Sequence, residues 1–219
     1  MKHVAIPPDR SESPATSDSH AGDCTSAAEV LVIACGALAR EVQAVLAANR
    51  LDHVTLTCLP AILHNRPEKI PEAVRAAIRE NRGRYSRIAV AYADCGTGGL
   101  LERVCAEEGA TMIAGPHCYA FYSGTERFLA AGDADMQSFF LTDFLARQFE
   151  AFVIEPLGLD RHPELRDAYF GNYRQLVYLA QTDDAELEAK ARAAAERLGL
   201  AYEKRMTGLG DLEPFVASL

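Results

Sequence analysis

The chain has 219 residues, of which 49% are hydrophobic and 24% are charged, and its net charge is −9. This is an ordinary globular composition, with enough chain for one substantial core. Net negative charge without a run of Lys or Arg argues against a nucleic-acid partner. No apolar stretch reaches the roughly 18 residues of a membrane span, and the N-terminus lacks the apolar part of a signal peptide. We therefore expect a cytoplasmic protein without a nucleic-acid or membrane partner.

Residues 1–28 are rich in Ser, Pro, Asp and Ala and contain few large apolar side chains. Such a segment buries too little surface to offset its ordering entropy, so it is predicted to be a flexible tail. His3, His20 and Cys24 lie in it, and no specific role is expected for them. Residues 29–219 are predicted to form a single α/β domain.

From residue 29 onward, strand-like and helix-like patterns alternate. Residues 29–36 form a continuous apolar run, which indicates a strand buried on both faces, and 37–50 carry apolar residues at helical spacing. Further strands are predicted at 53–60, 86–96 and 110–118, and further helices at 70–81 and 99–109. This alternation predicts βαβ units and a mainly parallel sheet.

The second half of the chain is less regular. Residues 137–158 are predicted to be helical for most of their length, and 137–152 are apolar enough to form either a core helix or a dimer face. A helix is predicted over 183–200, with Asp183 as its cap and Glu186 completing a capping box. Strands are predicted at 174–181 and 201–206. The whole pattern predicts a three-layer α/β sandwich with a mainly parallel, Rossmann-like sheet.

Cysteines stand where three of the predicted strands end: Cys35, Cys95 and Cys118. His64 lies in the loop after the second strand, and His117 stands directly before Cys118. Because ligands bind at the carboxyl ends of parallel strands, these side chains are expected to gather at one edge of the sheet. Three thiolates with one or two imidazoles suit zinc or an iron–sulfur cluster. A thiol at a helix N-terminus is also expected to have a lowered pKa.

Structural roles compete with this metal-site hypothesis. Cys35 fits one more buried strand thiol equally well, and His64 fits a helix cap or a bond to a carbonyl. Asp94 either caps the next helix or acts as a catalytic group beside its neighbour. Cys58, in an apolar strand, and Cys105, in an amphipathic helix, are expected to be small core residues.

Candidate substrate contacts lie next to the thiols. They are Gly96, Gly98, Asn65 and Tyr119, although its type favours a packing role for Tyr119 over a catalytic one. The glycines lack the third member of G-x-G-x-x-G, so a dinucleotide site is a weak match. The chain has no P-loop, no G-x-S-x-G elbow and no H-E-x-x-H helix.

Four blocks, taken together and in this order, resemble the family known as domain of unknown function 1638. They are IACGALAREV at 33–42, LHNRPEKI at 63–70, YADCGTGGL at 92–100 and GPHCYAFYSGTERF at 115–128. In that family the third block usually reads Y-G-x-C-G-x-G and the fourth P-x-x-D-C. Here Ala93 and Asp94 precede Cys95, and His117 precedes Cys118 where an Asp is common, which leaves the role of His117 open.

The resemblance implies that Cys35, Cys95 and Cys118 are the principal site residues, followed by His64. Family members occur in organisms with corrinoid-dependent methyltransferase systems, which implies a link to one-carbon metabolism and a corrinoid or methyltransferase protein as partner. The chain lacks the D-x-H-x-x-G motif, so it is not expected to be the corrinoid carrier itself.

Three functions follow from these residues. The first is a zinc enzyme, a transferase or hydrolase, that activates a thiol or water for reaction with a small substrate. The second is an accessory protein that holds an iron–sulfur cluster or delivers a metal or cofactor to a methyltransferase. The third is a metal-free enzyme with Cys95 as the nucleophile and His64 or His117 as its base.

Overall fold

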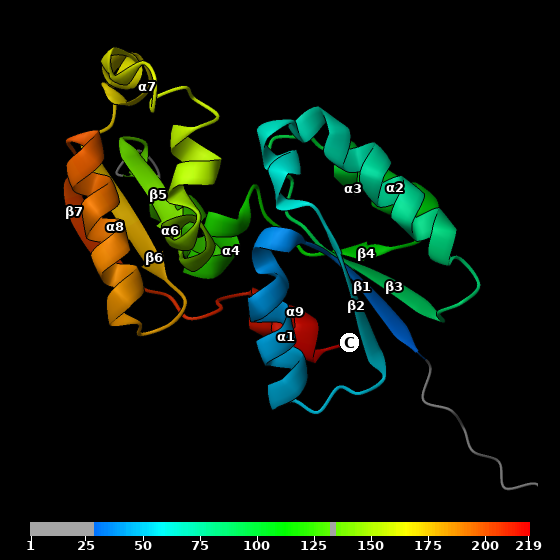
Figure 1. The fold of residues 1–219 in the computed structure, drawn as a ribbon. Helices are drawn as coiled ribbons and strands as arrows, with labels where there is room; N and C mark the ends of the chain where they lie inside the picture. Colours follow the sequence, from blue (N-terminus) through cyan, green and yellow to red (C-terminus); the bar gives the residue numbers. More distant parts are fainter. Residues whose placement is uncertain (1–28, 132–134) are drawn as a thin grey trace, which may run out of the picture.

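The computed structural model describes residues 29–131 and 135–219, which form two α/β lobes (Figure 1). The predicted tail, with His3, His20 and Cys24, lies outside the described residues. The predicted α/β class is confirmed, because helices alternate with strands and the paired strands of both sheets run parallel. The strands divide into two sheets, of four and three strands, which the sequence pattern did not indicate.

The first lobe is built on the sheet β2-β1-β3-β4. Its strands are β1 (Val30–Cys35), β2 (Val54–Leu59), β3 (Arg87–Ala91) and β4 (Thr111–Met112). Its helices are α1 (Ala39–Ala48), α2 (Ile70–Asn81) and α3 (Leu100–Glu108), with single turns η1 (Gly36–Leu38), η2 (Ala61–Asn65) and η3 (Pro67–Lys69). β1 is central and buried throughout, as expected for an apolar run covered on both faces.

The second lobe is built on the sheet β5-β6-β7. Its strands are β5 (Ser138–Thr142), β6 (Gln175–Ala180) and β7 (Ala201–Met206). Around them lie α6 (Asp143–Arg147), the π-helical turn η5 (Glu150–Ile154), η6 (Pro163–Leu165), α7 (Arg166–Phe170) and α8 (Ala185–Leu198). Each sheet has its own large apolar core.

The chain crosses between the lobes twice. The helices α4 (Cys118–Ser123) and α5 (Thr125–Ala131) lead from the first lobe into the second. After β7 the chain returns, and α9 (Leu212–Ala217) packs beside α1 (Figure 1). The prediction of a single domain over 29–219 stays a prediction, and the double crossing favours it. No helix in the described part of the chain is long and apolar enough to cross a membrane.

The helix predicted over 137–158 is wrong at its start, where β5 stands instead. The neighbouring residues Phe139 and Phe140 pack into two different apolar clusters, as expected for a strand with apolar groups on both faces. Aromatic residues also favour strands, and here this preference outweighs the helix-like spacing of the segment. The helix α6 begins only after Thr142, whose Oγ1 accepts a hydrogen bond from the Leu145 N–H at 3.3 Å.

The cap predicted for α8 is displaced by one residue. Asp184, not Asp183, accepts hydrogen bonds from the backbone N–H groups of Glu186 and Leu187, at 2.9 and 3.1 Å. Asp183 instead lies 3.1 Å from the Lys204 ammonium. Both aspartates precede the helix, so spacing alone could not choose between them.

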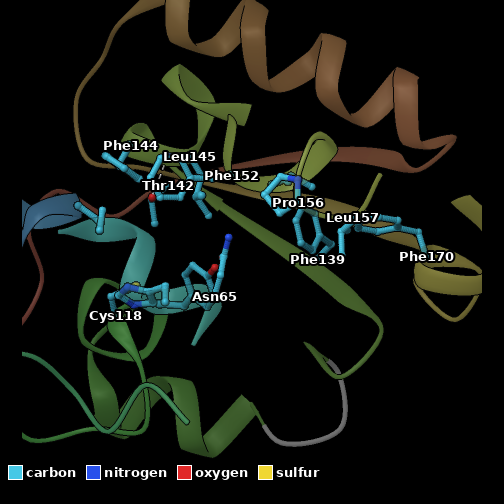
Figure 2. Close-up of a pocket in the computed structure, with 15 residues that line it drawn as sticks. Asn65, Cys118, Phe139, Thr142, Phe144, Leu145, Phe152, Pro156, Leu157 and Phe170 are labelled. Atoms are coloured by element: carbon cyan, nitrogen blue, oxygen red, sulfur yellow. Dashed lines mark hydrogen bonds between the residues drawn. The ribbon is translucent and has the colours of Figure 1, made fainter. Parts of the chain in front are cut away.

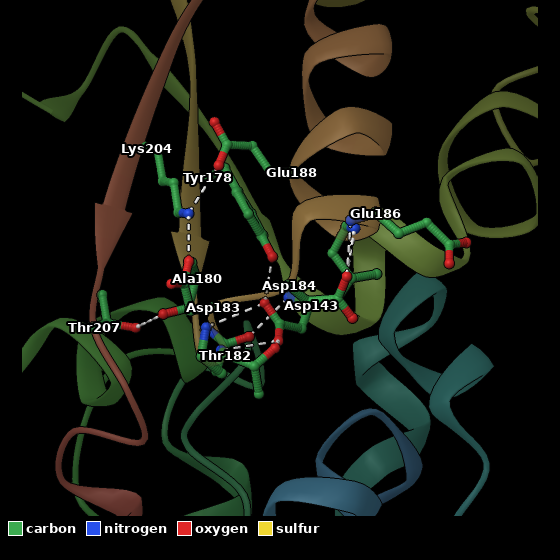
Figure 3. A network of polar contacts seen from close by, with 12 residues as sticks. Asp143, Tyr178, Ala180, Thr182, Asp183, Asp184, Glu186, Glu188, Lys204 and Thr207 are labelled. Atoms are coloured by element: carbon green, nitrogen blue, oxygen red, sulfur yellow. Dashed lines mark hydrogen bonds and ion pairs between the residues drawn. The ribbon is translucent and has the colours of Figure 1, made fainter.

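A buried carboxylate holds the second sheet together at the strand ends (Figure 3). Asp143, at the start of α6, is fully buried, and its carboxylate accepts hydrogen bonds from the Tyr178 hydroxyl at 2.6 Å and from the backbone N–H groups of Gln181 and Thr182 at 3.1 Å. A buried charge with this many donors is satisfied. Asp143 therefore joins β5 to the end of β6.

Candidate functional site

The three cysteines at the strand ends lie at the same edge of the first sheet. Cys35 is the last residue of β1, Cys95 lies in the loop after β3, and Cys118 opens α4. The three are near enough for a charge on Cys35 to raise the pKa of both other thiols. With His64 of η2 they form what we call the thiol cluster.

A direct contact in the thiol cluster joins Cys35 to His64. The Cys35 Sγ lies 3.4 Å from the His64 Nδ1 and also accepts a hydrogen bond from the Ala37 N–H at 3.4 Å. A thiolate sulfur and an imidazole nitrogen on one tetrahedral zinc are about 3.6 Å apart, given Zn–S and Zn–N bonds of about 2.3 and 2.1 Å. This donor pair therefore fits zinc in both chemistry and separation.

The other donors are not close enough to complete such a shell. Within residues 29–131 and 135–219, no three His, Cys, Asp or Glu side chains are arranged to hold a metal ion. Soft sulfur and imidazole donors still suit zinc by type. The described residues thus provide two donors, Cys35 and His64, at a separation that suits zinc, with two further thiols nearby. They do not form a complete coordination site.

Burial controls the protonation of the thiol cluster. It raises the pKa of Cys35 to about 11 and that of Cys95 to about 12, and it raises the pKa of Cys118 as well. Burial also lowers the pKa of His64. The expectation that a helix N-terminus would lower a thiol pKa is wrong here, because desolvation outweighs the backbone dipoles. At neutral pH the Cys35–His64 contact is therefore between a neutral thiol and a neutral imidazole.

A tyrosine that the sequence did not single out lies beside the thiol cluster. Tyr92 is only 1% exposed, and its ring stacks on His64 with 6.4 Å between centroids. Burial, followed by the nearby Cys35 and Cys95 thiols, raises the pKa of its hydroxyl. The Cys35 Sγ lies within hydrogen-bonding reach of that hydroxyl, although the contact lacks good hydrogen-bond geometry. A neutral thiol is a weak acceptor, so a thiolate at Cys35 or a ligand near the thiols would satisfy this buried hydroxyl better.

Cys95 is held in an unusual backbone conformation. Its φ of 48° lies in the left-handed region, which costs a residue with a Cβ about 1–3 kcal/mol and persists only where the surrounding structure enforces it. Its N–H donates to the Pro116 carbonyl at 2.8 Å, which ties the loop after β3 to the segment that leads into Cys118. The strained backbone of Cys95 thus occurs where its loop is bonded to the segment that carries Cys118.

Asp94 caps the turn that follows it. Its carboxylate accepts hydrogen bonds from the Thr97 hydroxyl at 2.7 Å and from the backbone N–H groups of Gly98 and Gly99 at 3.1 and 2.6 Å. Burial raises the pKa of Asp94, but these hydrogen bonds outweigh it and the net pKa is lowered. Both oxygens are occupied, so the structure favours the capping role over the catalytic one.

His117 faces a different environment from His64. Its ring packs edge-on against Phe128, with 5.0 Å between centroids, and tilts against Tyr119 at 5.3 Å. Its Nδ1 is buried without a hydrogen-bond partner among the described residues. The structure thus places His64 in contact with a thiol and His117 in an aromatic cluster.

Two further cysteines lie among the described residues, and Cys58 is near enough to the thiol cluster for its charge to raise the pKa of Cys35. Cys105 is buried in α3, as predicted. The prediction of a core position for Cys58 is wrong, because β2 is the edge strand of its sheet and the residue is exposed.

A cavity of about 460 Å³ opens where the lobes meet (Figure 2). Cys118 and His64 line it, as do Asn65 and Tyr119, two of the predicted substrate contacts. Gly96 and Gly98, the other two, are not among its described lining residues. The opposite wall comes from the second lobe, including Thr142 and several phenylalanines. Two members of the thiol cluster therefore face a ligand-sized space.

The family model described as "Protein of unknown function (DUF1638)" matches residues 58–216, most of the chain. The chain belongs to this DUF1638 family. The match includes His64, Cys95 and Cys118 but begins after Cys35, so one of the four blocks that carried the resemblance lies outside it. No curated protein and no solved structure matches the chain.

Sequence reasoning missed Tyr92 and the aromatic wall of the cavity. Tyr92 directly follows β3 and leads into the Cys95 loop, so a hydroxyl at the end of an apolar run was a signal in the sequence. The phenylalanines stand in the segment that was expected to be one helix, a core element or a dimer face. Nothing local indicates that they line a cavity with residues from the other lobe.

Proposed function

We propose that this protein is a zinc-thiolate protein that binds a small molecule between its lobes and activates a thiol or a water molecule there. One observation carries the proposal: Cys118 and His64 belong both to the thiol cluster and to the cavity wall. A molecule in the cavity would reach the groups proposed to hold the metal. Zinc, when bound, would supply the Lewis acidity that deprotonates a thiol or water near neutral pH.

The protein's own side chains have distinct parts in this proposal. Cys35, Cys95 and Cys118 would provide the thiolates, and the proposal requires the latter two to move toward the Cys35–His64 pair. Because burial raises the pKa of these thiols, they would ionise at neutral pH only beside a positive charge, which bound zinc would supply. His64 would either complete the ligand set or take the proton from the bound thiol or water.

We also propose reaction with a methyl donor, and only the family resemblance supports this part of the proposal. A substrate thiol activated at the cluster would suit methyl transfer, with a corrinoid or methyltransferase protein as partner, and activated water would suit hydrolysis. An iron–sulfur cluster or a metal-delivery role would use the same thiols.

A second candidate is supported by the 3.4 Å contact between Cys35 Sγ and His64 Nδ1. It is a metal-free enzyme in which the thiol attacks and the imidazole is the base. The pair places Cys35, rather than Cys95, next to His64. A Cys35 pKa of about 11 leaves little thiolate at neutral pH, so this candidate ranks second.

The test is elemental analysis of protein purified without oxygen or chelators, together with its absorption spectrum. We expect about one zinc per chain. Cys35→Ser, Cys95→Ser and Cys118→Ser should each lose it, whereas Cys58→Ser and Cys105→Ser should retain it. Loss of zinc in His64→Ala would make this residue a ligand, and retention would make it the base.

Two other results would change the proposal. Stoichiometric iron with a charge-transfer band would indicate a cluster protein. Absence of any stoichiometric metal from the wild-type protein would contradict metal binding, and rapid alkylation of Cys35 that depends on His64 would then favour the metal-free enzyme.

A further inference from the structure

The cavity between the lobes is lined by uncharged side chains. None of its 15 described lining residues is Asp, Glu, Lys or Arg. Other cavities differ, since Arg127, Asp135 and Arg205 line one, and Arg147 and Lys190 line another. A phosphate or polycarboxylate ligand would need a cation or an array of donors. The composition of the wall therefore disfavours nucleotides and other strongly charged ligands.

Phenylalanine rings form the second-lobe wall of this cavity (Figure 2). Phe144 packs edge-on against Phe152 with 5.0 Å between ring centroids, and Phe139 packs edge-on against Phe170 at 5.1 Å. Phe139, Phe144 and Phe152 are nevertheless only partly buried. Their edge-to-face contacts fix the rings in place while leaving apolar surface open to the cavity, which is the arrangement that favours a ring-bearing ligand.

The backbone beneath this wall is irregular. Phe152 and Val153, both lining residues, lie in the π-helical turn Glu150–Ile154. Such turns are rare and occur often at functional sites, because they re-aim side chains that an α-helix would direct elsewhere. The turn thus supports a ligand-binding role for the aromatic wall.

Polar groups are concentrated on the first-lobe side of the cavity. The Asn65 side chain points into it, and Cys118 lies on the same side (Figure 2). No described hydrogen bond engages the Asn65 amide. It is therefore available to a hydrogen-bonding group on a ligand, next to the thiol cluster.

We infer that the cavity binds a small, uncharged, ring-containing molecule whose body packs on Phe139, Phe144 and Phe152 and whose single polar group faces Asn65 and the thiol cluster. This inference deepens the proposed function and rests on it for the chemistry of the polar group. It names a substrate class: aryl or aralkyl compounds with one hydrogen-bonding or thiol head. Binding of the ring itself requires only the cavity.

The test uses N-phenyl-1-naphthylamine, a neutral aromatic probe that fluoresces in apolar sites, with full-length protein in zinc-free and zinc-loaded form. We expect saturable binding of about one probe per chain, since the cavity is of single-ligand size. Leu157→Trp fills the cavity and should weaken binding at least about tenfold. Leu129→Trp is the matched control, because Leu129 is 63% exposed on α5 and is not among the described lining residues.

Phe152→Leu is a second variant, which removes part of the ring wall with little change in size and should weaken binding by a smaller factor. Displacement by benzyl mercaptan but not by adenosine monophosphate supports the ligand class. Absence of saturable binding, equal affinity in Leu157→Trp and wild type, or displacement by the nucleotide would overturn the inference. Cys35→Ser should bind the probe yet lose zinc, so failure of the metal site and failure of the ligand class are distinguishable.

Discussion

Tyr92 is the residue whose environment is least explained by folding alone. Its hydroxyl is buried against the thiol cluster, where the Cys35 thiol, a weak acceptor, is the group within hydrogen-bonding reach, and its ring stacks on His64. Stability would be served better by phenylalanine at this position. The hydroxyl is therefore best understood as a donor reserved for a thiolate or a bound ligand.

Replacing Tyr92 with phenylalanine should separate stability from binding. The metal-free Tyr92→Phe protein should be more stable than wild type, by up to about 1–3 kcal/mol, because a buried hydroxyl that has only a neutral thiol within reach is removed. Its zinc affinity should fall about tenfold or more, as for loss of an outer hydrogen bond to a metal ligand. Urea unfolding and competition with a zinc chelator measure the two effects.

Tyr202 provides the matched control. Its hydroxyl is buried too, without a partner in the described part of the chain, but it lies on β7 in the other lobe. Tyr202→Phe should change stability in the same direction and leave zinc affinity unchanged. Unchanged zinc affinity in Tyr92→Phe as well would show that the Tyr92 hydroxyl has no part in the site.

Among the elements, α1 and α6 bring charged side chains together where the lobes meet. Glu41 of α1 is 7% exposed, and Arg40, Asp143 and Arg147 are the charged groups around it. Burial raises the pKa of Glu41, Arg147 lowers it in part, and Asp143 raises it further. Since the folded pKa lies above the ordinary value of 4.5, the stabilising effect of protonated Glu41 is complete below pH 4.5 and is lost as the pH rises through the folded pKa.

Glu41→Gln should therefore be more stable than wild type at pH 7, where the native carboxylate is ionised at a burial cost. The advantage should shrink as the pH falls below 4.5, where the wild-type side chain is also neutral. Thermal unfolding across pH measures this difference. Glu80→Gln, at an exposed position of α2, should show no such pH-dependent gain, and a destabilised Glu41→Gln at pH 7 would contradict the argument.

Strong local periodicity made most elements predictable. The apolar run of β1 and the amphipathic α2 and α8 stand close to their predicted places. β5 was missed because its aromatic residues are compatible with either a helix or a strand. Pairing with β6, which is distant in sequence, decides in favour of the strand. The exposure of Cys58 was missed for a similar reason, since local pattern does not show which strand lies at an edge.

The part of the candidate site that was predictable from the sequence is the part that follows from one rule of sheet topology. Parallel strands bring their carboxyl ends to one edge, so Cys35, Cys95 and Cys118 could be grouped without any knowledge of their contacts. The choice of His64 over His117 as the thiol neighbour depends on how the loops close. The cavity depends on the second lobe, and no local pattern encodes the docking of one lobe on another.

At the scale of the whole molecule, the return crossing from β7 to α9 fixes the second lobe to the first. Gly210 lies in it with φ of 51°, and a Cβ there would stand 2.1 Å from the Phe121 carbonyl oxygen in α4. The neighbouring Asp211 accepts a hydrogen bond from the Thr125 N–H at 2.7 Å. The crossing is thus packed directly on the outgoing connection.

Alanine at Gly210 should destabilise the protein much more than alanine at Gly208. Gly208 also has a positive φ, 58°, but nothing lies within 4 Å of its would-be Cβ, so its variant should lose only about 1–2 kcal/mol. Gly210→Ala adds a clash with backbone atoms, which cannot rotate away. Chemical unfolding of both variants measures the difference, and equal losses would show that the crossing is loosely packed.

Cobalt(II) titration of metal-free protein tests the central claim most directly, because the spectrum reports the ligands as well as the stoichiometry. We predict a thiolate-to-cobalt charge-transfer band that saturates at about one cobalt per chain, disappears on adding zinc, and weakens in Cys35→Ser, Cys95→Ser and Cys118→Ser but not in Cys58→Ser. Saturation without a charge-transfer band, or no binding at excess cobalt, would contradict a metal site built from the thiol cluster.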